Sequence, residues 1–321
     1  MKIAVIKLGA RGDVLRTLPI IEAIKEKYPA AQLKLITNPV MTDILKHQPS
    51  IDELLTEVPL HKSFDILYNF DIDANALKLA SSIKAKKKYG FYSNDRHLAA
   101  FNLGAEYYIN TIFDDDLKKS NKKTYQEMMF EVAELPPSRK PYHIYLTQDA
   151  KEKAARFIAQ HKLENKKIIG IHMGASPRWP SKSWSEEQLK NFIRTATQQY
   201  TIFLFGGPDE ASRYPAFLAS LHKEALQVFP FFSLPDEEFA AMISVCNTMI
   251  CSDSYALHIA LGLGKKTIAL FFCTSPDEVE GYGLLKKMIS PLLYDFFPER
   301  QDQFSKELVN SIRAQDVVAL L

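Results

Sequence analysis

The sequence predicts an α/β protein with two successive doubly wound domains. Apolar runs of strand length alternate with amphipathic helical segments through both halves of the chain. Strands that alternate with helices favour a parallel sheet covered on both faces. The alternation breaks once, at Pro136-Pro137-Ser138-Arg139-Lys140-Pro141, and then resumes. Because Pro-rich, charged stretches are typical of domain boundaries, we expect domains at residues 1–140 and 141–303.

In the first half, a buried strand is predicted at the N-terminus and is followed by a glycine-containing turn. The expected strands are residues 2–7, 32–37 and 66–70, and the expected helices are residues 14–27 and 72–90. The second helix would end in the charge run Lys84-Ala85-Lys86-Lys87-Lys88, which we interpret as a solvated helix end.

The second half repeats this rhythm and closes with an amphipathic tail. The expected strands are residues 167–172, 201–205, 248–251 and 267–272, and the expected helices are residues 186–199, 209–222 and 256–263. In the tail, residues 304–321, apolar positions recur with helical spacing. Two doubly wound domains predict a ligand cleft near the carboxyl ends of the strands.

Composition excludes several classes of protein. The 321 residues are 46% hydrophobic and 24% charged, as in ordinary globular chains, so neither disorder nor a fibrous repeat is expected. A net charge of +2 does not fit a dedicated nucleic-acid binder. The three cysteines have no metal-ligand spacing, and the apolar run before Lys7 is too short for a signal peptide. We therefore expect a cytoplasmic protein without a transmembrane segment.

The first candidate for chemistry is Asp13, in the loop Gly9-Ala10-Arg11-Gly12-Asp13 after the first strand. Two glycines let the backbone approach a ligand closely, and a following helix N-terminus favours anions. The loop matches neither the dinucleotide fingerprint nor the P-loop. Asp13 could equally be an ordinary helix N-cap, so both interpretations stay open.

Three further candidates follow strands of the second half. Lys182, between two tryptophans, could neutralise a phosphate or simply cover apolar surface. Glu210, after Gly206-Gly207-Pro208, could accept hydrogen bonds from ribose or be a first-turn helix acid. In Ser252-Asp253-Ser254-Tyr255-Ala256-Leu257-His258, the aspartate and serine could cap a helix, and His258 could contact a phosphate.

The sequence contains no HExxH motif and no paired CxxC, and we expect no metal site. It also has no GxSxG elbow. An NAD-dependent dehydrogenase is also disfavoured, because no strand is followed by a dinucleotide fingerprint with an acid about 20 residues further on.

Taken in order along the chain, these segments resemble glycosyltransferase family 9, the bacterial heptosyltransferases of lipopolysaccharide assembly. The resemblance covers nearly the whole chain. It is carried by the segments Lys7-Leu8-Gly9-Ala10-Arg11-Gly12-Asp13-Val14-Leu15 with Pro19, Asn121-Lys122-Lys123-Thr124-Tyr125-Gln126, Gly174-Ala175-Ser176 with Lys182-Ser183-Trp184, Phe205-Gly206-Gly207-Pro208-Asp209-Glu210, and Ser252-Asp253-Ser254 with His258.

The resemblance implies a GT-B architecture, in which two Rossmann-like domains face a cleft and the tail 304–321 packs back towards the first domain. It also implies inverting, metal-independent transfer of heptose from ADP-heptose to a lipopolysaccharide inner-core acceptor, with no cofactor besides the nucleotide sugar. Asp13 resembles the general base. The implied donor-binding residues are Ser176, Lys182, Glu210, Ser233, Asp253, Ser254, Tyr255, Ala256 and His258.

Two departures from the family pattern concern the donor half. Tyr255 stands where the family commonly has a glycine that gives access to the phosphate, and Phe272-Cys273 replaces a Gly-Pro pair. These departures keep two alternatives open: a different nucleotide-sugar donor, or a protein that binds nucleotide sugars without catalysis.

For the acceptor, the resemblance implies an anionic lipopolysaccharide precursor on the inner face of the cytoplasmic membrane, where the protein would bind peripherally. Basic residues near the base would hold it. The candidates are Arg11, Lys122 and Lys123.

Overall fold

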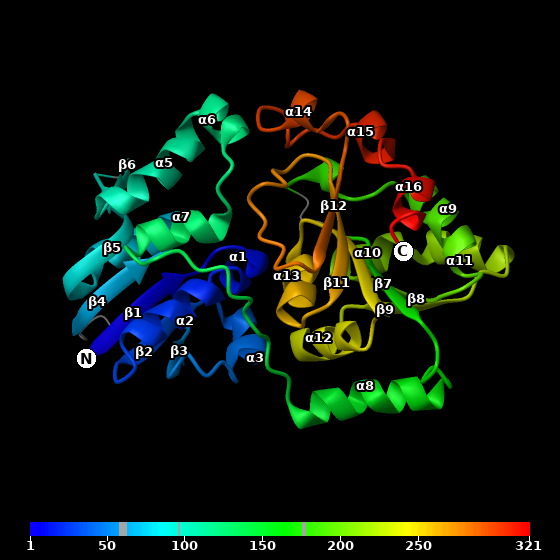
Figure 1. Cartoon of the computed structure of the whole chain (residues 1–321), viewed down its shortest axis with the longest axis horizontal. Coiled ribbons are helices and arrows are strands. Elements are labelled where there is room, and N and C mark those ends of the chain that lie inside the picture. The colour runs from blue at the N-terminus through cyan, green and yellow to red at the C-terminus, as the bar shows by residue number, and fades with distance from the viewer. Residues whose placement is uncertain (58–62, 96, 175–177) are drawn as a thin grey trace. The chain divides into compact units, whose positions relative to one another are not determined.

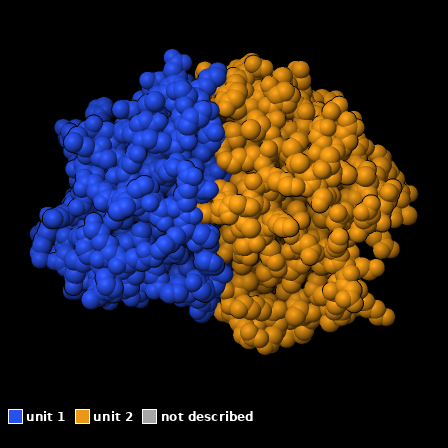
Figure 2. Space-filling model, viewed as in Figure 1, with its two compact units in different colours: residues 1–145, 277–280 blue, residues 146–276, 281–321 orange. Residues whose placement is uncertain are grey.

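The computed structural model describes residues 1–57, 63–95, 97–174 and 178–321. The chain divides into two compact units (Figure 2). The first unit consists of residues 1–145 and 277–280, and the second of residues 146–276 and 281–321. A short stretch of the second half of the sequence therefore belongs to the first unit.

The first unit is built on a six-stranded sheet in the order β3-β2-β1-β4-β5-β6, in which only β6 runs antiparallel to its neighbour (Figure 1). Its strands are β1 (Lys2–Lys7), β2 (Gln32–Thr37), β3 (Glu53–Leu55), β4 (Ser63–Asn69), β5 (Lys84–Asn94) and β6 (His97–Ala100). The apolar residues Ile3–Ile6 of β1 are fully buried, as expected for a central parallel strand.

The connecting helices of the first unit are mostly short. They are α1 (Arg11–Leu15), α2 (Leu18–Lys27), η1 (Pro39–Met41), α3 (Thr42–Leu45), α4 (Ala74–Ser82), η2 (Leu103–Ala105), α5 (Glu106–Phe113), α6 (Asp115–Ser120) and α7 (Tyr125–Val132). The predicted helix at 14–27 is two helices, because the chain turns at Arg16 and Thr17, where the Thr17 hydroxyl donates to the Asp13 carbonyl.

The predicted helix at 72–90 is wrong in its second half. The helix α4 ends at Ser82, and Lys84–Lys88 belongs to strand β5, which pairs along its length with β4. Side-chain contacts make this lysine-rich strand possible: Lys86 pairs with Asp65 at 2.7 Å, and Lys88 donates to the Ala80 carbonyl and lies 5.1 Å from the centre of the Phe101 ring. Tertiary pairing thus overrides the helical propensity of lysine.

The second unit contains an all-parallel sheet in the order β12-β11-β10-β7-β8-β9. Its strands are β7 (Ile168–His172), β8 (Thr201–Gly206), β9 (Val228–Phe232), β10 (Thr248–Ser252), β11 (Lys266–Phe271) and β12 (Leu285–Ile289). Its helices are α8 (Gln148–Gln160), η3 (Pro180–Lys182), α9 (Glu186–Ala196), α10 (Pro208–Arg213), α11 (Pro215–Lys223), α12 (Asp236–Ser244), α13 (Tyr255–Gly262), α14 (Leu293–Phe296), α15 (Lys306–Asn310) and α16 (Ala314–Val318). The helix predicted at 209–222 is interrupted at Tyr214, before Pro215.

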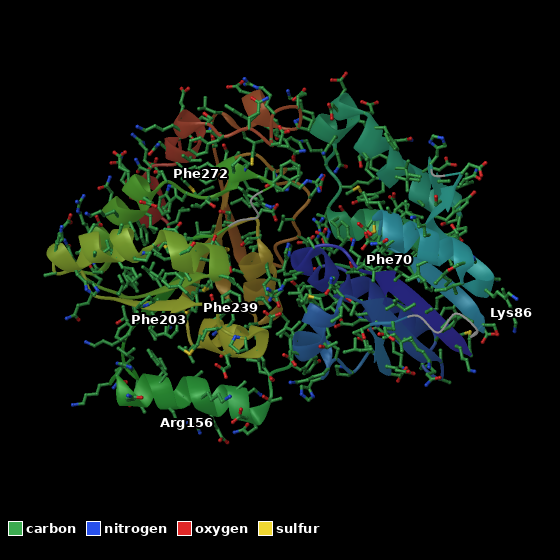
Figure 3. All side chains as sticks on the ribbon, turned by 180° about the vertical axis from the view of Figure 1, so that it is seen from behind. Phe70, Lys86, Arg156, Phe203, Phe239 and Phe272 are labelled. Atoms are coloured by element: carbon green, nitrogen blue, oxygen red, sulfur yellow. The ribbon has the colours of Figure 1, made fainter. Side chains whose placement is uncertain are left out.

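Aromatic side chains fill much of the core of the second unit. Phe203 of β8 and Phe239 of α12, both labelled in Figure 3, each contact Phe205, with ring centres 6.4 and 5.5 Å apart. Phe157 of α8 packs edge-on against Phe203, with ring centres 5.8 Å apart. These contacts fix α8 and α12 against the sheet.

The tail forms two short helices, α15 and α16, instead of the single helical stretch suggested by its periodicity. Its apolar residues Leu308, Ile312 and Val317 are buried in the core of the second unit, where α16 packs on α9. The tail is therefore an integral part of the second unit.

Both sheets change direction of winding at one point. The first sheet does so between β1 and β4, and the second between β7 and β10. Ligands of doubly wound proteins bind beyond the carboxyl ends of the strands at such a switch point. In the described part of the chain, no helix has the length and apolar character needed to cross a membrane.

Candidate functional site

At the switch point of the first sheet, the loop after β1 is held by Asp71, which follows β4. The Asp71 carboxylate accepts hydrogen bonds from the backbone N–H groups of Leu8, at 2.7 Å, and Gly9. A side chain at Gly9 would bring its Cβ within 3.0 Å of the same carboxylate, so glycine permits this approach. Asp71 directly follows the expected strand 66–70, but the sequence alone does not single it out, because only the pairing of β1 with β4 brings it to this loop.

Asp13 lies in α1 and does not cap it. Ala10 occupies the N-cap position, and Asp13 is the third residue of the helix, so the N-cap interpretation is wrong. Its carboxylate Oδ1 lies 2.9 Å from a guanidinium nitrogen of Arg16, and its side chain is 36% exposed. Asp13 is therefore a partly accessible carboxylate in an ion pair beyond the carboxyl end of β1.

Two cations, the buried Lys7 and the largely buried Arg16, lie close to Asp13. Burial by itself lowers the pKa of Arg16, but the Asp13 carboxylate and Tyr125 outweigh it and hold the pKa above its usual value. Burial also acts to lower the pKa of Lys7, but Tyr125, Asp71 and Asp13 together raise it, and the Lys7 Nζ donates to the Phe70 carbonyl at 2.9 Å. Both side chains stay charged at neutral pH, which favours an ionised Asp13.

The basic residues predicted to bind the acceptor are distributed over two elements. Arg11 is the first residue of α1, whereas Lys122 and Lys123 precede α7. Lys122 pairs with Asp277 at 2.9 Å. Lys123 pairs with Glu131 at 2.7 Å and lies 3.9 Å from the centre of the Tyr107 ring. Both lysines thus already have carboxylate partners within the first unit.

The lysines of β5 lie at the other edge of the same sheet. The parallel register pairs Lys84 with Ser63, at the start of both strands. Lys86 points outward from this amino edge (Figure 3). Because Asp13 follows the carboxyl end of β1, the β5 lysines lie at the opposite edge of the sheet from it. Lys84, Lys86 and Lys87 are exposed, as expected for solvated charges, but they belong to a strand and not to a helix end.

At the switch point of the second sheet, three predicted site residues meet. Asp253 follows β10 and lies between Lys182, whose Nζ is 3.1 Å from Oδ2, and His258, whose Nε2 is 3.9 Å from Oδ1. The side chains of Lys182, Asp253 and His258 are 14%, 18% and 6% exposed, so the cluster is largely shielded from water. A cation in such a place is suited to an anionic ligand.

The loop that carries Lys182 is anchored by the tail. The buried Ser181 hydroxyl donates to the Gln303 carbonyl and accepts from the Ser305 N–H, each at 2.8 Å. The indole N–H of Trp184 donates to the Ile312 carbonyl at 2.9 Å. Sequence reasoning missed this role of Ser181 and Trp184, because nothing local in the sequence connects positions 181–184 with the tail.

Glu210 is buried and accepts a hydrogen bond from the Gly207 N–H at 2.8 Å, as a first-turn helix acid does. Space for its carboxylate is made by Gly174, which follows β7. A Cβ at Gly174 would lie 2.6 and 2.7 Å from the two carboxylate oxygens. Glu210 is therefore a first-turn helix acid, and its carboxylate has the capacity to accept further hydrogen bonds.

The first turn of α13 presents backbone N–H groups beside Asp253. Ser254 is the N-cap residue, but its side chain makes no capping hydrogen bond, and its buried hydroxyl has no hydrogen-bond partner among the described residues. Tyr255 and Ala256 are the first two residues of α13, so their backbone N–H groups belong to the amino end of the helix, which favours anions. The Tyr255 ring stacks on Phe239 at 6.2 Å, so its bulk is directed against α12.

The remaining donor candidates are Ser233, which follows the edge strand β9, and Ser176. Ser233 follows β9 with a positive φ of 59°, and its N–H donates to the Gly206 carbonyl at 3.0 Å. Ser176 falls outside the described residues. Burial raises the pKa of the Cys273 thiol to about 11, with Asp253 adding to the effect and Lys182 opposing it. This thiol is therefore protonated at neutral pH.

Among the described residues, no group of three or more histidine, cysteine or acidic side chains is arranged to hold a metal ion.

Comparison with known proteins agrees with both the motifs and the fold. The lipopolysaccharide heptosyltransferase 1 of Campylobacter coli is 23% identical over 297 residues, which cover 85% of this chain and 84% of that protein.

Two solved structures share the fold along nearly the whole chain. The glycosyl transferase family 9 protein of Veillonella parvula has a TM-score of 0.74 at 18% identity, covering 99% of this chain and 95% of that one. The ADP-heptose lps heptosyltransferase II of Escherichia coli has a TM-score of 0.70 at 15% identity, covering 99% and 97%. The fold is thus the GT-B arrangement of two Rossmann-like domains.

Residues 60–306 match the sequence profile described as Glycosyltransferase family 9 (heptosyltransferase). That match spans most of both units, and the candidate residues from Lys122 to His258 fall within it. The chain belongs to glycosyltransferase family 9 and is a glycosyltransferase.

Proposed function

We propose that this glycosyltransferase moves a heptose from ADP-heptose to the inner core of a lipopolysaccharide precursor, with inversion at the anomeric carbon and without a metal ion. The observation that carries the proposal is the shielded cluster of Lys182, Asp253 and His258 at the switch point of the second sheet. The names of the similar proteins, heptosyltransferases among them, supply the sugar and the acceptor.

In this proposal the second unit binds the donor. Lys182 and the first N–H groups of α13 stabilise the diphosphate, as positive charge and helix N-termini do in general. His258 contacts a phosphate, and Glu210 accepts hydrogen bonds from the ribose. Asp253 orients Lys182 and accepts hydrogen bonds from hydroxyl groups of the sugar.

The first unit supplies the base. Asp13 takes the proton from the acceptor hydroxyl while the hydroxyl oxygen forms a bond to the anomeric carbon. The bond from that carbon to the diphosphate breaks on the opposite face, so ADP leaves with the bonding electrons and the configuration inverts. The charge that develops on ADP is stabilised by Lys182 and the N–H groups, which in this proposal take the place of a metal ion.

The acceptor is anionic, and we propose that Arg11, Lys122 and Lys123 orient it at the cytoplasmic face of the membrane. The ion pairs that Lys122 and Lys123 make with Asp277 and Glu131 limit the attraction they exert. We therefore expect their contribution to acceptor binding to be modest.

A second candidate function is transfer from a different nucleotide sugar. It is favoured by one observation: Tyr255 places an aromatic ring at the first position of α13, next to Ser254 and Asp253. A ring there changes the shape of the region around the diphosphate and the sugar. A role in binding without catalysis would require Asp13 to be dispensable.

The test is a transfer assay with purified protein, a lipopolysaccharide inner-core acceptor and a panel of ADP-, UDP- and GDP-sugars. We expect product only with ADP-heptose, unchanged turnover in EDTA, and an inverted anomeric configuration by NMR. The Asp13→Asn variant should lose about 10²-fold or more in kcat, and Asp316→Asn, which alters an exposed ion pair with Arg313, serves as its control.

Three results would count against the proposal. Preferential transfer from another nucleotide sugar would replace the donor. Loss of activity in EDTA that is restored by a divalent metal would overturn metal independence. Wild-type turnover by Asp13→Asn would remove the base.

A further inference from the structure

We propose that Arg16, held face-on by Tyr125, is a positioning residue that fixes the carboxylate of Asp13 in the orientation needed to accept a proton. The inference rests on the proposed function, in which Asp13 is the general base. It gives a role in positioning Asp13 to an arginine near the start of the first unit's sequence and to a tyrosine near its end.

The contacts form a closed ring of interactions around Asp13. The Arg16 guanidinium lies 2.9 Å from Asp13 Oδ1 and 3.8 Å from the centre of the Tyr125 ring. The Tyr125 hydroxyl is 3.1 Å from the Thr17 hydroxyl, which donates to the Asp13 carbonyl at 2.7 Å. One aromatic residue thus contacts the two residues that hold both the side chain and the backbone of Asp13.

Tyr125 is itself fixed from several directions. It is fully buried and is the first residue of α7. Its N–H donates to the carbonyl of Glu278 at 2.9 Å, in the short segment that the second half of the sequence contributes to the first unit. The capping box of Thr124 and Glu127 closes the same helix end. The ring is therefore a rigid platform for the guanidinium.

Arginine is suited to this place in a way that lysine is not. The guanidinium is planar, so it can stack on an aromatic ring and donate a directed hydrogen bond at its edge. The side chain of Arg16 is only 14% exposed, which strengthens its interaction with the carboxylate relative to a surface pair. An exposed aspartate without such a partner would occupy several rotamers.

The charged and titratable groups around this pair come from four other elements of the first unit. They are Lys7 of β1, Tyr108 of α5, Tyr125 of α7 and Glu278 of the segment 277–280, and Arg11 lies on the same helix as Asp13. Lys7 is a second cation near Asp13, so removal of Arg16 leaves part of the positive field in place. Tyr108 is neutral at neutral pH, since burial raises the pKa of its hydroxyl.

The deciding experiment measures the pKa of Asp13 directly, through the ¹³Cγ shifts of aspartate-labelled protein, with Asp13→Asn used to assign the resonance. In Arg16→Gln we expect the Asp13 pKa to rise by about one unit or more, because an adjacent opposite charge that favoured the ionised form is gone. Arg16→Lys should restore most of the pKa, since the positive charge returns. Arg313→Gln, which removes an exposed arginine from an ion pair with Asp316, is the matched control and should leave the Asp13 pKa unchanged.

Kinetics provide the second readout. We expect Arg16→Gln to lower kcat about 10-fold without changing the KM for the donor, within the range over which general bases contribute. Arg16→Lys should recover only part of kcat, because the ammonium does not stack. Tyr125→Leu removes the aromatic ring on which the guanidinium lies and should approach Arg16→Gln.

An Asp13 pKa and a kcat that both stay at wild-type values in Arg16→Gln would overturn the inference. A shifted pKa with unchanged kcat would overturn it too, because the pair would then be only structural. If Arg16→Gln does not fold, equal kcat and Asp13 pKa in Arg16→Lys and wild type would refute the need for the planar group. Failure of the proposed function has a different signature: wild-type turnover of Asp13→Asn, whatever Arg16 does.

Discussion

The two sheets of this protein follow the same winding order, yet the candidate functional side chains at their switch points differ in the sign of their charge. In the first unit, the loop after β1 leads to a carboxylate, Asp13, which lies near the buried Lys7 and the largely buried Arg16. In the second unit, the loop after β7 leads to a cation, Lys182, which is backed by the carboxylate of Asp253. Each functional charge is thus paired with its opposite.

The two units therefore show that the fold determines where a site lies, whereas the side chains determine what the site does. The doubly wound topology places loops together at the carboxyl edge of each sheet. A carboxylate held ionised by cations is suited to accept a proton, whereas a shielded ammonium is suited to bind an anion. In the proposed function, proton transfer therefore belongs to the first unit and donor binding to the second.

The largest effect on donor binding is expected from Lys182→Met. Loss of a charge-assisted contact to the diphosphate should weaken ADP binding by about 10- to 100-fold. Calorimetry with ADP checks this. Lys190→Met is the control, because Lys190 is also a part-buried lysine of the second unit, paired with Glu224 at 2.7 Å. Equal ADP affinity in Lys182→Met and wild type would contradict the assignment of Lys182 to the donor site.

Ser181→Ala tests whether the tail supports the donor site. The substitution leaves the Gln303 carbonyl and the Ser305 N–H without their buried partner, so we expect a loss of about 1–3 kcal/mol in stability. Because the Lys182 loop loosens, ADP affinity should fall several-fold as well. In Ser244→Ala, which removes a hydroxyl bonded only to the Ala241 carbonyl of its own helix, ADP affinity should not change. A destabilised Ser181→Ala with unchanged ADP affinity would show that the anchor is only structural.

Glu210→Gln tests the assignment of the ribose. The amide oxygen can still accept from the Gly207 N–H, but the carboxylate no longer accepts from ribose hydroxyls, so ADP should lose about 10-fold in affinity. The 2′-deoxy analogue should lose less. Glu237→Gln, whose carboxylate accepts from the Thr147 N–H at 2.7 Å, is the matched control. Equal losses for ADP and its deoxy analogue would leave Glu210 as a helix acid alone.

Charge reversal at Lys122 and Lys123 tests whether the first unit binds the acceptor. The double variant should raise the acceptor KM several-fold at low salt and leave ADP affinity unchanged, because screened surface charges act mainly on the anionic acceptor. The same reversal at Lys84 and Lys86, on the opposite edge of the same sheet, is the control. An unaltered acceptor KM in the first variant would remove these lysines from the site.

The smallest expected effect concerns Glu22 of α2, a titrating group that could obscure pH profiles of the first unit. Burial raises its pKa to about 7, with Glu26 adding to the effect and Lys140 opposing it. A carboxyl whose pKa is raised on folding stabilises the protein at low pH, and this contribution is lost between about pH 4.5 and 7. Glu22→Gln should therefore flatten the dependence of Tm on pH in this range. An unchanged dependence of Tm on pH in Glu22→Gln would contradict the raised pKa of Glu22.

The sequence was most informative where a strand is buried on both faces. The apolar runs of β1, β8 and β11 predicted those strands closely, because a continuous apolar segment of this length has few other uses. The lysine-rich strands β5 and β12 were not predicted, since their stability comes from neighbouring strands and not from local apolar pattern.

The candidate site shows the same division. Asp13, Lys182 and Asp253 could be named because each follows a recognisable strand. Their partners could not, because the contacts of Arg16 with Tyr125 and of Ser181 with Gln303 join residues far apart in the sequence. Only the tertiary structure brings such residues together.

In the proposed function, the carboxylate of Asp13 in the first unit accepts the proton during sugar transfer, and the cation Lys182 in the second unit binds the donor. Calorimetric titration of ADP into Asp13→Asn and into Lys182→Met, beside the kcat of both variants, tests it most directly. The account predicts wild-type ADP affinity with kcat reduced about 10²-fold or more for Asp13→Asn, and ADP affinity reduced about 10-fold or more for Lys182→Met. Weak ADP binding by Asp13→Asn together with wild-type ADP affinity in Lys182→Met would contradict it.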